Sequence, residues 1–587
     1  MSKITLSLTL ALTMLFSAVV NIQFRKSLNY AGAAGSLTSQ ESQFAALVNG
    51  TNAYGYDSEL EKIALNHSIS NYSFRAGGSA GATATAIWFR DKLVSFGLDV
   101  SLESFEFTNW NLPTQPILKI DQDGDSSTTS YQTLMRSFQS EHFSWPTPEG
   151  GVFADLVVLP LPAASDFNEI GRNPINSTLW NSIDTQGKIV LIGREVRWGH
   201  SWEQSFQTKL STQPPVAVVY TWWYPWMLFS PPFFSSVGGR PPSNLGPYYW
   251  NLQIPAGWVN YEDGLLIRDK ENSLNVSAKI VIPSVIGSGP HYNVVGKLRG
   301  NVDQSKFVIV SGHYDTVMTS GFVDNGAGTS AVLELARVFT KAAKEGLYKP
   351  DYSVLFVGFA SEELGLVGSS NYVKQHKGDM NDIVAVINVD SIGSDNLYVT
   401  QTDPGKGFDL DELVQKAATD LNTSAAFMEQ GGSDQEAFRD PNVANSFYIE
   451  WWPGLSIGIG DAVPVKSSAM LVSFPLLYSD KWNRHSPGWI HTAYDNSTST
   501  QTLSWLEPDN LEEQIKVAAL SVMRVSPSSQ VVDGQPLFFP FLVLGVAVAA
   551  VVVAVTVVYF VKVRKPRSKP LRNKSARRGF IGFNIGF

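Results

Sequence analysis

Three apolar runs between Phe307 and Asp390 each end in residues that bind metals or move protons. Phe307–Ser311 leads into Gly312-His313-Tyr314-Asp315, Tyr352–Phe359 leads into Ser361-Glu362-Glu363, and Ile383–Val389 leads into Asp390. Each run has the length and the β-branched content of a buried parallel strand. In open α/β sheets, ligands bind just beyond the carboxyl ends of the strands. The pattern therefore predicts a site at one edge of a parallel sheet.

Helical spacing of apolar residues flanks these strands. Ser79 to Phe96 is predicted to be a helix that ends at Gly97, and Val100 to Phe107 alternates like a strand. The apolar face expected for this helix consists of Ala84, Ile87, Trp88, Leu93 and Val94. A second helix is predicted from Thr329 to Lys344, with Val332, Leu335, Val338, Phe339 and Ala342 on one face. A closing helix is expected from Leu511 to Val525.

The length of 587 residues predicts two or three domains. Short β runs punctuated by proline and glycine occupy 149–283, which indicates a β-rich insert. The insert divides an α/β domain into two parts, 36–148 and 284–527. Residues 528–536 are expected to form a short linker.

Two segments indicate that the protein is attached to a membrane. Residues 1–35 are predicted to contain a signal peptide or an uncleaved N-terminal anchor, because Lys3 precedes an apolar stretch. Leu537 to Val561 is uncharged and long enough for a transmembrane helix. The basic tail, 562–587, favours the cytoplasmic side. The expected location is the cell membrane, with a single span, the bulk of the chain extracellular and the tail cytoplasmic.

The charge and the cysteine content limit the possible partners and the possible metal ligands. The net charge is −9, although the tail alone carries nine Lys or Arg and no acid, so the rest of the chain carries −18. A surface this acidic repels nucleic acid, which we exclude as a partner. The chain has no cysteine, so any metal must be held by histidine and carboxylates.

The candidate ligands come from separate segments. His313 and Asp315 share one face of an extended segment, so one can bind metal while the other supports it. Asp324 lies in a loop of small residues, where its carboxylate could bridge two cations. Glu362 and Glu363 diverge, so one can hold metal while the other acts as a base. Asp390 and His491 complete the candidate set. Taken singly, each motif fits a turn, a buried polar pair or a solvated charge at least as well as it fits a metal site.

Together these motifs resemble the two-zinc aminopeptidases, a family that includes bacterial leucyl aminopeptidases and the glutamate carboxypeptidase group. The resemblance rests on His-x-Asp, Asp-Asn-Gly-Ala-Gly, Glu-Glu, Asp and His-Thr-x-x-Asp in this order, and it covers about residues 70 to 525. It implies a phosphorylase/hydrolase-like α/β fold, a mixed sheet flanked by helices, with a protease-associated domain as the insert. It also implies peptide substrates and two Zn²⁺ ions.

The resemblance assigns a role to each residue. His313 and Asp390 would hold one zinc, Glu363 and His491 the other, and Asp324 would bridge them. Glu362 would be the general base, and Asp315 would support His313 as a second catalytic group. The resemblance also implies a cis peptide bond between Asp324 and Asn325.

Two positions depart from the family pattern. Ile490 stands where some relatives have a tyrosine that donates to the oxyanion, and Gln435 stands where relatives often have histidine. The leading hypothesis is a membrane-tethered zinc aminopeptidase. Alternatives are a glutamate carboxypeptidase-like dipeptidase or carboxypeptidase, a non-catalytic receptor-like scaffold, and a single-zinc glutaminyl cyclase. The side-chain preference, the working pH and the oligomeric state stay open, with a homodimer as one option.

Overall fold

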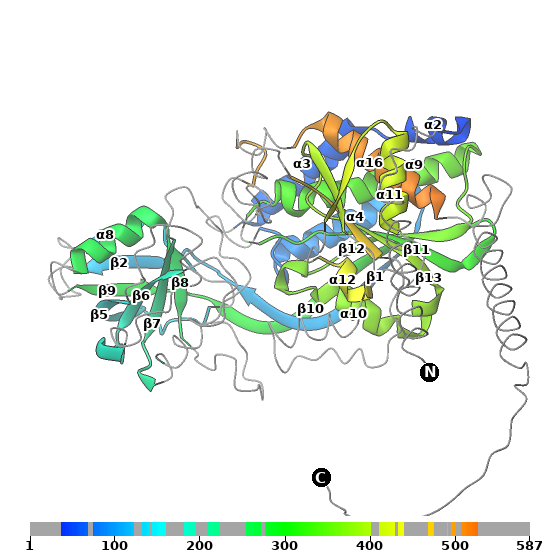
Figure 1. The fold of residues 1–587 in the computed structure, drawn as a ribbon. Helices are drawn as coiled ribbons and strands as arrows, with labels where there is room; N and C mark the ends of the chain where they lie inside the picture. The colour runs from blue at the N-terminus through cyan, green and yellow to red at the C-terminus, as the bar shows by residue number, and fades with distance from the viewer. Residues whose placement is uncertain are drawn as a thin grey trace, which may run out of the picture. The chain divides into compact units, whose positions relative to one another are not determined.

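A computed structural model describes sixteen stretches of the chain. They are residues 37–68, 74–121, 132–140, 144–159, 181–194, 209, 212–222, 254–271, 276–317, 319–400, 410–428, 433–439, 468–474, 490, 495–499 and 506–525. Two eight-stranded sheets account for the described strands, which makes the fold mixed α/β as predicted (Figure 1).

The first sheet has the strand order β1-β10-β12-β11-β13-β16-β14-β15. Its strands are β1 (Asp99–Asn111), β10 (Val285–Leu298), β11 (Asp303–His313), β12 (Tyr352–Phe359), β13 (Ile383–Val389), β14 (Asn396–Thr400), β15 (Ala425–Met428) and β16 (Ser468–Phe474). β12, β11, β13 and β16 run parallel, and β1 and β10 pair antiparallel with their neighbours. β14 pairs antiparallel with β16 and parallel with β15. The three apolar runs that the sequence singles out are therefore adjacent parallel strands.

Parallel pairing brings the polar residues that follow these strands to one edge. His313 pairs with Phe359, and Ser311 pairs with Asn388, so β11, β12 and β13 end at nearly the same level. Almost every residue of β12 and β13 is buried, as expected for strands covered on both faces. The chain therefore leaves the three strands at one place.

Helices cover both faces of this sheet (Figure 1). On one face α4 (Ala80–Phe96) packs on β10 and α9 (Gly328–Glu345) packs on β11 to β13, with α3 (Gly50–His67) and α16 (Pro508–Arg524) outside them. On the other face lie α10 (Val367–Gln375) and α12 (Gln435–Arg439). The remaining described helices near this sheet are α2 (Ser39–Ala45) and α11 (Leu410–Asp420). The face predicted for α9 is confirmed, because all five of its expected residues are fully buried.

The bounds predicted for α4 are right, and its predicted face is right at Leu93 but wrong at Ile87 and Val94. Ile87 and Val94 are 43% and 53% exposed, while the small residues Gly81, Ala82 and Ala86 are buried. A methyl group added at Gly81 would overlap the carbonyl oxygen of Phe74. α4 thus buries small residues together with Phe89 and Leu93, so its buried face only partly overlaps the predicted one.

The second sheet has the order β3-β2-β9-β5-β6-β7-β8-β4. Its strands are β2 (Ile117–Asp121), β3 (Gln132–Leu134), β4 (Gln139–Ser140), β5 (Val152–Leu159), β6 (Ile189–Arg194), β7 (Ala217–Trp222), β8 (Ala256–Val259) and β9 (Ser277–Val281), with the helix α8 (Tyr261–Glu271). It begins at Ile117, so the expected boundary at 149 is too late. Only Leu112-Pro113-Thr114-Gln115-Pro116 separates β1 from β2, so the chain enters the second sheet after a short connection.

Several predicted segments lie outside the described residues. They are the N-terminal segment 1–35, the linker 528–536, the span Leu537–Val561 and the tail 562–587. Within the described stretches, none of the helices combines the length and the apolar character required to cross a bilayer.

Candidate metal centre

His313, the last residue of β11, lies at the centre of a group of carboxylates. Its Nε2 atom is 3.3 Å from Asp324 Oδ1, 3.5 Å from Asp390 Oδ1 and 3.9 Å from Glu362 Oε2. The imidazole is 1% exposed, and Nδ1 faces the backbone oxygen of Asp315 at 3.1 Å. A hydrogen bond donated from Nδ1 leaves Nε2 as the atom that can bind a cation.

The loop that carries Asp324 is tied to the end of β13. The Asn325 side chain donates to Val389 O at 2.9 Å and accepts from Ser391 N at 3.1 Å, so it spans the residues on either side of Asp390. The expected cis peptide bond between Asp324 and Asn325 is present. These contacts explain how two carboxylates 66 residues apart in the chain face the same imidazole.

Glu362 and Glu363 form a short 3-10 turn after β12. The Asp315 carboxylate accepts from both backbone N–H groups of this pair, at 3.0 Å from Glu362 N and 3.2 Å from Glu363 N. Its nearest oxygen lies 3.6 Å from His313 Nδ1, too far for a good hydrogen bond. Asp315 therefore supports His313 mainly through its backbone and orients the glutamate turn with its side chain, a role that the sequence did not reveal.

Two groups of ligand atoms, each within 4.8 Å of one another, emerge from this arrangement. One consists of His313, Asp324 and Asp390, and the other of His313, Glu362 and Glu363. The structure thus brings together six of the seven residues that the sequence nominated. The seventh, His491, lies outside the described residues, although Ile490 and Asp495 on either side of it are described.

The electrostatics of the cluster favour cations. Burial lowers the pKa of His313, but the charges of Asp390 and Glu362 outweigh this effect and raise it well above its usual value. Burial raises the pKa of Glu362 well above its usual range, and Glu363 adds to the rise while His313 opposes it. Carboxylates this close and this buried repel one another unless positive charge is present.

Asp434 is a member of the cluster that the sequence analysis missed. Burial raises its pKa to about 7, and His313, Asp315 and Asp390 all act on it electrostatically. Asn388 donates to Ser433 Oγ and Gln435 Oε1 on either side of it, at 2.9 and 3.3 Å. The Ser-Asp-Gln triplet was noted only for its missing histidine, because nothing in the local pattern marks Asp434 as buried.

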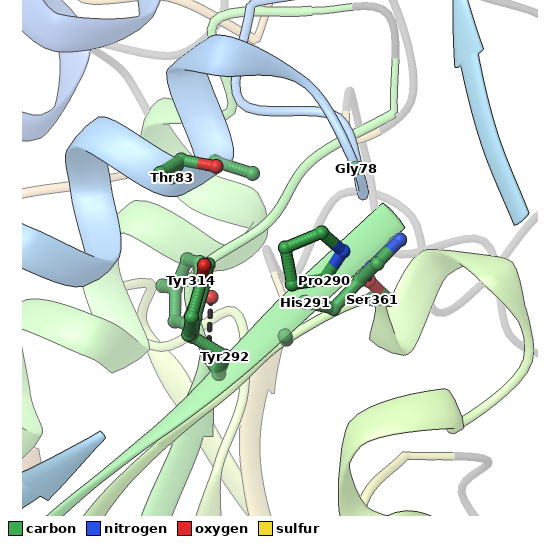
Figure 2. A pocket seen from close by; sticks show the side chains of 9 residues that line it. Gly78, Thr83, Pro290, His291, Tyr292, Tyr314 and Ser361 are labelled. Atoms are coloured by element: carbon green, nitrogen blue, oxygen red, sulfur yellow. Dashed lines mark hydrogen bonds between the residues drawn. The ribbon is translucent and has the colours of Figure 1, made fainter. Parts of the chain in front are cut away.

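A small pocket lies behind the glutamate turn, between the start of α4, β10 and the end of β12 (Figure 2). His291 lines it, with Nδ1 2.6 Å from Ser361 Oγ and Nε2 2.6 Å from Asn109 Oδ1. Burial lowers the pKa of His291 to about 4, so the ring is neutral at pH 7. Nε2 then donates to Asn109, and Nδ1 accepts from Ser361, the residue immediately before Glu362.

The residues fit a divalent cation. His313 Nε2 is buried without a hydrogen-bond partner among the described residues, and carboxylate oxygens surround it. One imidazole nitrogen with several carboxylate oxygens and no thiolate is a donor set that zinc accepts. Such a donor set at the carboxyl ends of the parallel strands defines the site as a candidate divalent-metal centre.

Comparison with known proteins finds similarity to peptidases. Residues 293–515 match the model of Peptidase family M28. Aminopeptidase YwaD of Bacillus subtilis is 26% identical over 390 residues, which are 64% of this chain and 72% of that protein. A probable glutamate carboxypeptidase of Arabidopsis thaliana is 29% identical over 188 residues, 30% of this chain and 27% of that protein.

Solved structures share the fold. A zinc aminopeptidase from Bacillus subtilis superposes with a TM-score of 0.55 at 19% identity, covering 83% of this chain and 98% of that one. An aminopeptidase from an Aneurinibacillus strain gives a TM-score of 0.52 at 18% identity, covering 84% and 98%. Residues 293–515 are thus similar to Peptidase family M28, and these similarities support a metallopeptidase.

Proposed function

We propose that the protein is a zinc-dependent exopeptidase that removes residues from the free N-termini of peptides. The observation that carries the proposal is the buried placement of His313 between two groups of carboxylates, one with Asp324 and Asp390 and the other with Glu362 and Glu363. The similarity to YwaD, over 72% of the length of an aminopeptidase, supports the same activity.

The centre has ligands for two zinc ions in this proposal. His313 and Asp390 would hold one, Glu363 and His491 the other, and Asp324 would contact both. Bound zinc supplies Lewis acidity, which makes water a stronger acid and polarises a peptide carbonyl. The group of His313, Asp324 and Asp390 supports the first of these sites. Glu363 lies in the group with His313 and Glu362, and His491 enters the division on its sequence motif alone.

Glu362 would act as the general base and then as the general acid. Its carboxylate is 6% exposed and oriented by the hydrogen bond from its own backbone N–H to Asp315. It would accept a proton from the attacking water and later deliver it to the nitrogen of the leaving amine. Burial raises its pKa, which makes it a better proton acceptor than an exposed carboxylate.

The second candidate function is a carboxypeptidase or dipeptidase. The match to the Arabidopsis probable glutamate carboxypeptidase favours it, although that match covers 27% of the plant protein. A non-catalytic scaffold is disfavoured, because the described ligand positions and Glu362 are all acidic or imidazole groups gathered in one place.

The proposal includes a tether and an inserted domain. The uncharged Leu537–Val561 segment and the basic tail after it support a single membrane span with the peptidase domain outside the cell. The apolar N-terminal segment supports export. The second sheet is proposed to be the protease-associated domain, because the sequence places it as a β-rich insert between the two parts of the peptidase domain.

A zinc count combined with a substrate panel tests the proposal. The purified chain, exchanged into a metal-free buffer and titrated with zinc, is expected to bind two ions and to cleave free-amine peptides rather than N-blocked ones. Cleavage of N-blocked dipeptides would favour the carboxypeptidase function instead. Less than one bound zinc together with no cleavage of either class would reject both.

A further inference from the structure

The aspartate of the His-Thr-x-x-Asp motif, Asp495, is buried against the loop that carries Asp324. Asp495 Oδ1 accepts from Val323 N at 2.7 Å, and Oδ2 accepts from Asp324 N at 3.3 Å. A carboxylate that receives two successive backbone N–H groups fixes the direction of that backbone, because charge-assisted hydrogen bonds are short and directional. The residue is 1% exposed, so water does not compete for these bonds.

Arg75 holds the same loop from another direction. Its guanidinium is fully buried, and its Nη2 atom donates to Gly321 O at 3.0 Å. The Nε atom donates to Tyr314 O at 3.1 Å, and Tyr314 lies between His313 and Asp315. One side chain therefore contacts both segments that supply ligands to the described metal group.

The charges and the space around the loop agree with this arrangement. Asp495 is among the acidic side chains whose charges act on Arg75, so each compensates the buried charge of the other. Ser320 Oγ donates to Asp495 O at 2.8 Å. A methyl group added at Gly326 would lie 2.1 Å from Asp57 Oδ1, which leaves no room for the loop to move towards α3.

We propose that Arg75 and Asp495 act as a clamp that positions Asp324 for metal binding. The inference rests on the proposed zinc-dependent function and adds two positioning residues to it. The clamp accounts for the aspartate of a motif whose histidine alone was given a role.

The Asp495→Asn variant tests the clamp, with Glu334→Gln as the matched control. Asparagine keeps the shape but replaces one acceptor oxygen by an N–H₂ group that faces Val323 N or Asp324 N. Glu334 is also a fully buried carboxylate that accepts a backbone N–H, from Asn49 at 2.8 Å, and pairs with Arg337, but it contacts no candidate ligand. Both variants lose a buried charge, and only one touches the metal loop.

The measurements are zinc affinity, by competition with a metal buffer, and the thermal midpoint of the metal-free protein. Asp495→Asn is expected to weaken binding of at least one zinc by about 10- to 100-fold, the usual effect of losing a residue that orients a ligand. Glu334→Gln is expected to lower the thermal midpoint of the metal-free protein without changing zinc affinity. Equal zinc affinity in Asp495→Asn and the wild type would overturn the clamp.

A milder variant keeps the test decisive if Asp495→Asn does not fold. Ser320→Ala removes the hydroxyl that donates to Asp495 O and, at 3.3 Å, to Glu61 Oε1. A weakening of zinc binding by at least about threefold supports the clamp, whereas unchanged affinity overturns it. The wild-type titration separates the two levels of the argument. Absence of zinc binding by the wild type would remove the proposed function, while normal binding by both wild type and variants would remove the clamp alone.

Discussion

The two sheets have the same number of strands and very different interiors. In the second sheet, β6 and β7 bury Ile189, Val190, Val218 and Val219 completely, and no candidate metal group occurs among its described residues. In the first sheet, the strands are equally apolar, yet buried carboxylates follow them at one edge. Both sheets contain adjacent parallel strands, β5 to β8 in one and β12, β11 and β13 in the other. Parallel strands therefore provide a place for a site, and the charged residues after them decide whether chemistry occurs there.

The largest expected effect comes from the chemistry of the first sheet. Glu362→Gln removes the proton acceptor but keeps the shape and the backbone bond to Asp315. We expect kcat to fall by about 10²- to 10⁴-fold with zinc content unchanged, because general acid–base catalysis contributes a factor of this size. Steady-state kinetics and metal analysis of the same preparation measure both quantities. A kcat within about threefold of the wild type would exclude Glu362 as the base.

A pair of core variants separates the two sheets by stability and activity. Ile280 in β9 and Ile387 in β13 are both fully buried, so either change to alanine should cost about 2–5 kcal/mol of unfolding free energy. Only Ile387→Ala is expected to lower kcat/KM for a short peptide, since Ile387 lies three residues before Asp390. Urea unfolding and activity of the folded fraction distinguish the variants. Equal losses of activity would mean that the two sheets do not act independently.

His291 lies on β10, the strand through which the chain returns from the second sheet to the first. His291→Phe leaves the buried Ser361 hydroxyl without its acceptor, which should cost about 1–3 kcal/mol. Because Ser361 precedes Glu362, we expect kcat to fall several-fold while KM stays unchanged. His291→Gln, whose amide oxygen can accept from Ser361, should restore most of the loss. Changed KM with normal kcat would contradict this role.

The smallest effect should come from a histidine outside the centre. The hydrogen bond from His376 Nε2 to Glu103, at 2.9 Å, outweighs burial and raises the pKa of His376, with Asp379 adding to the rise. A raised folded-state pKa gives stability that is fully present below the ordinary value of 6.5 and disappears as the pH rises through the elevated value. His376→Gln should therefore cost about 0.2–1 kcal/mol at pH 5.5 and less at pH 9. A larger loss of unfolding free energy at pH 9 than at pH 5.5 would contradict the expected direction of this pH dependence.

Local pattern predicted the elements that carry the site. The runs that became β11, β12 and β13 are apolar enough to be recognised singly, and the polar residues after them stand out by contrast. α9 was placed correctly because its buried residues are large and regularly spaced. The face of α4 was only partly predicted, because small residues such as Gly81, Ala82 and Ala86, which leave little hydrophobic signal, share the interior with Leu93. The start of the second sheet was missed because β2 to β4 are short strands that precede the β-rich stretch recognised from 149.

The supporting residues of the centre could not be found from the sequence. Arg75, Asp434 and Asp495 look like ordinary charged residues, and each is buried because segments far apart in the chain fold around it. The sequence placed Asp315 in the site but did not predict its role. Its side chain accepts from the backbone N–H groups of a turn that begins 47 residues later.

By itself, the sequence determined which groups are available: carboxylates and histidine in place of thiolates, and apolar strands that carry them to an edge. Only the tertiary structure decided which of these groups face the same imidazole and which backbone bonds hold them there. The physical reason is the separation along the chain of the residues that interact. Strand and helix patterns depend on residues a few positions apart, whereas a metal centre depends on distances between segments that only the packed sheet brings within a few ångströms.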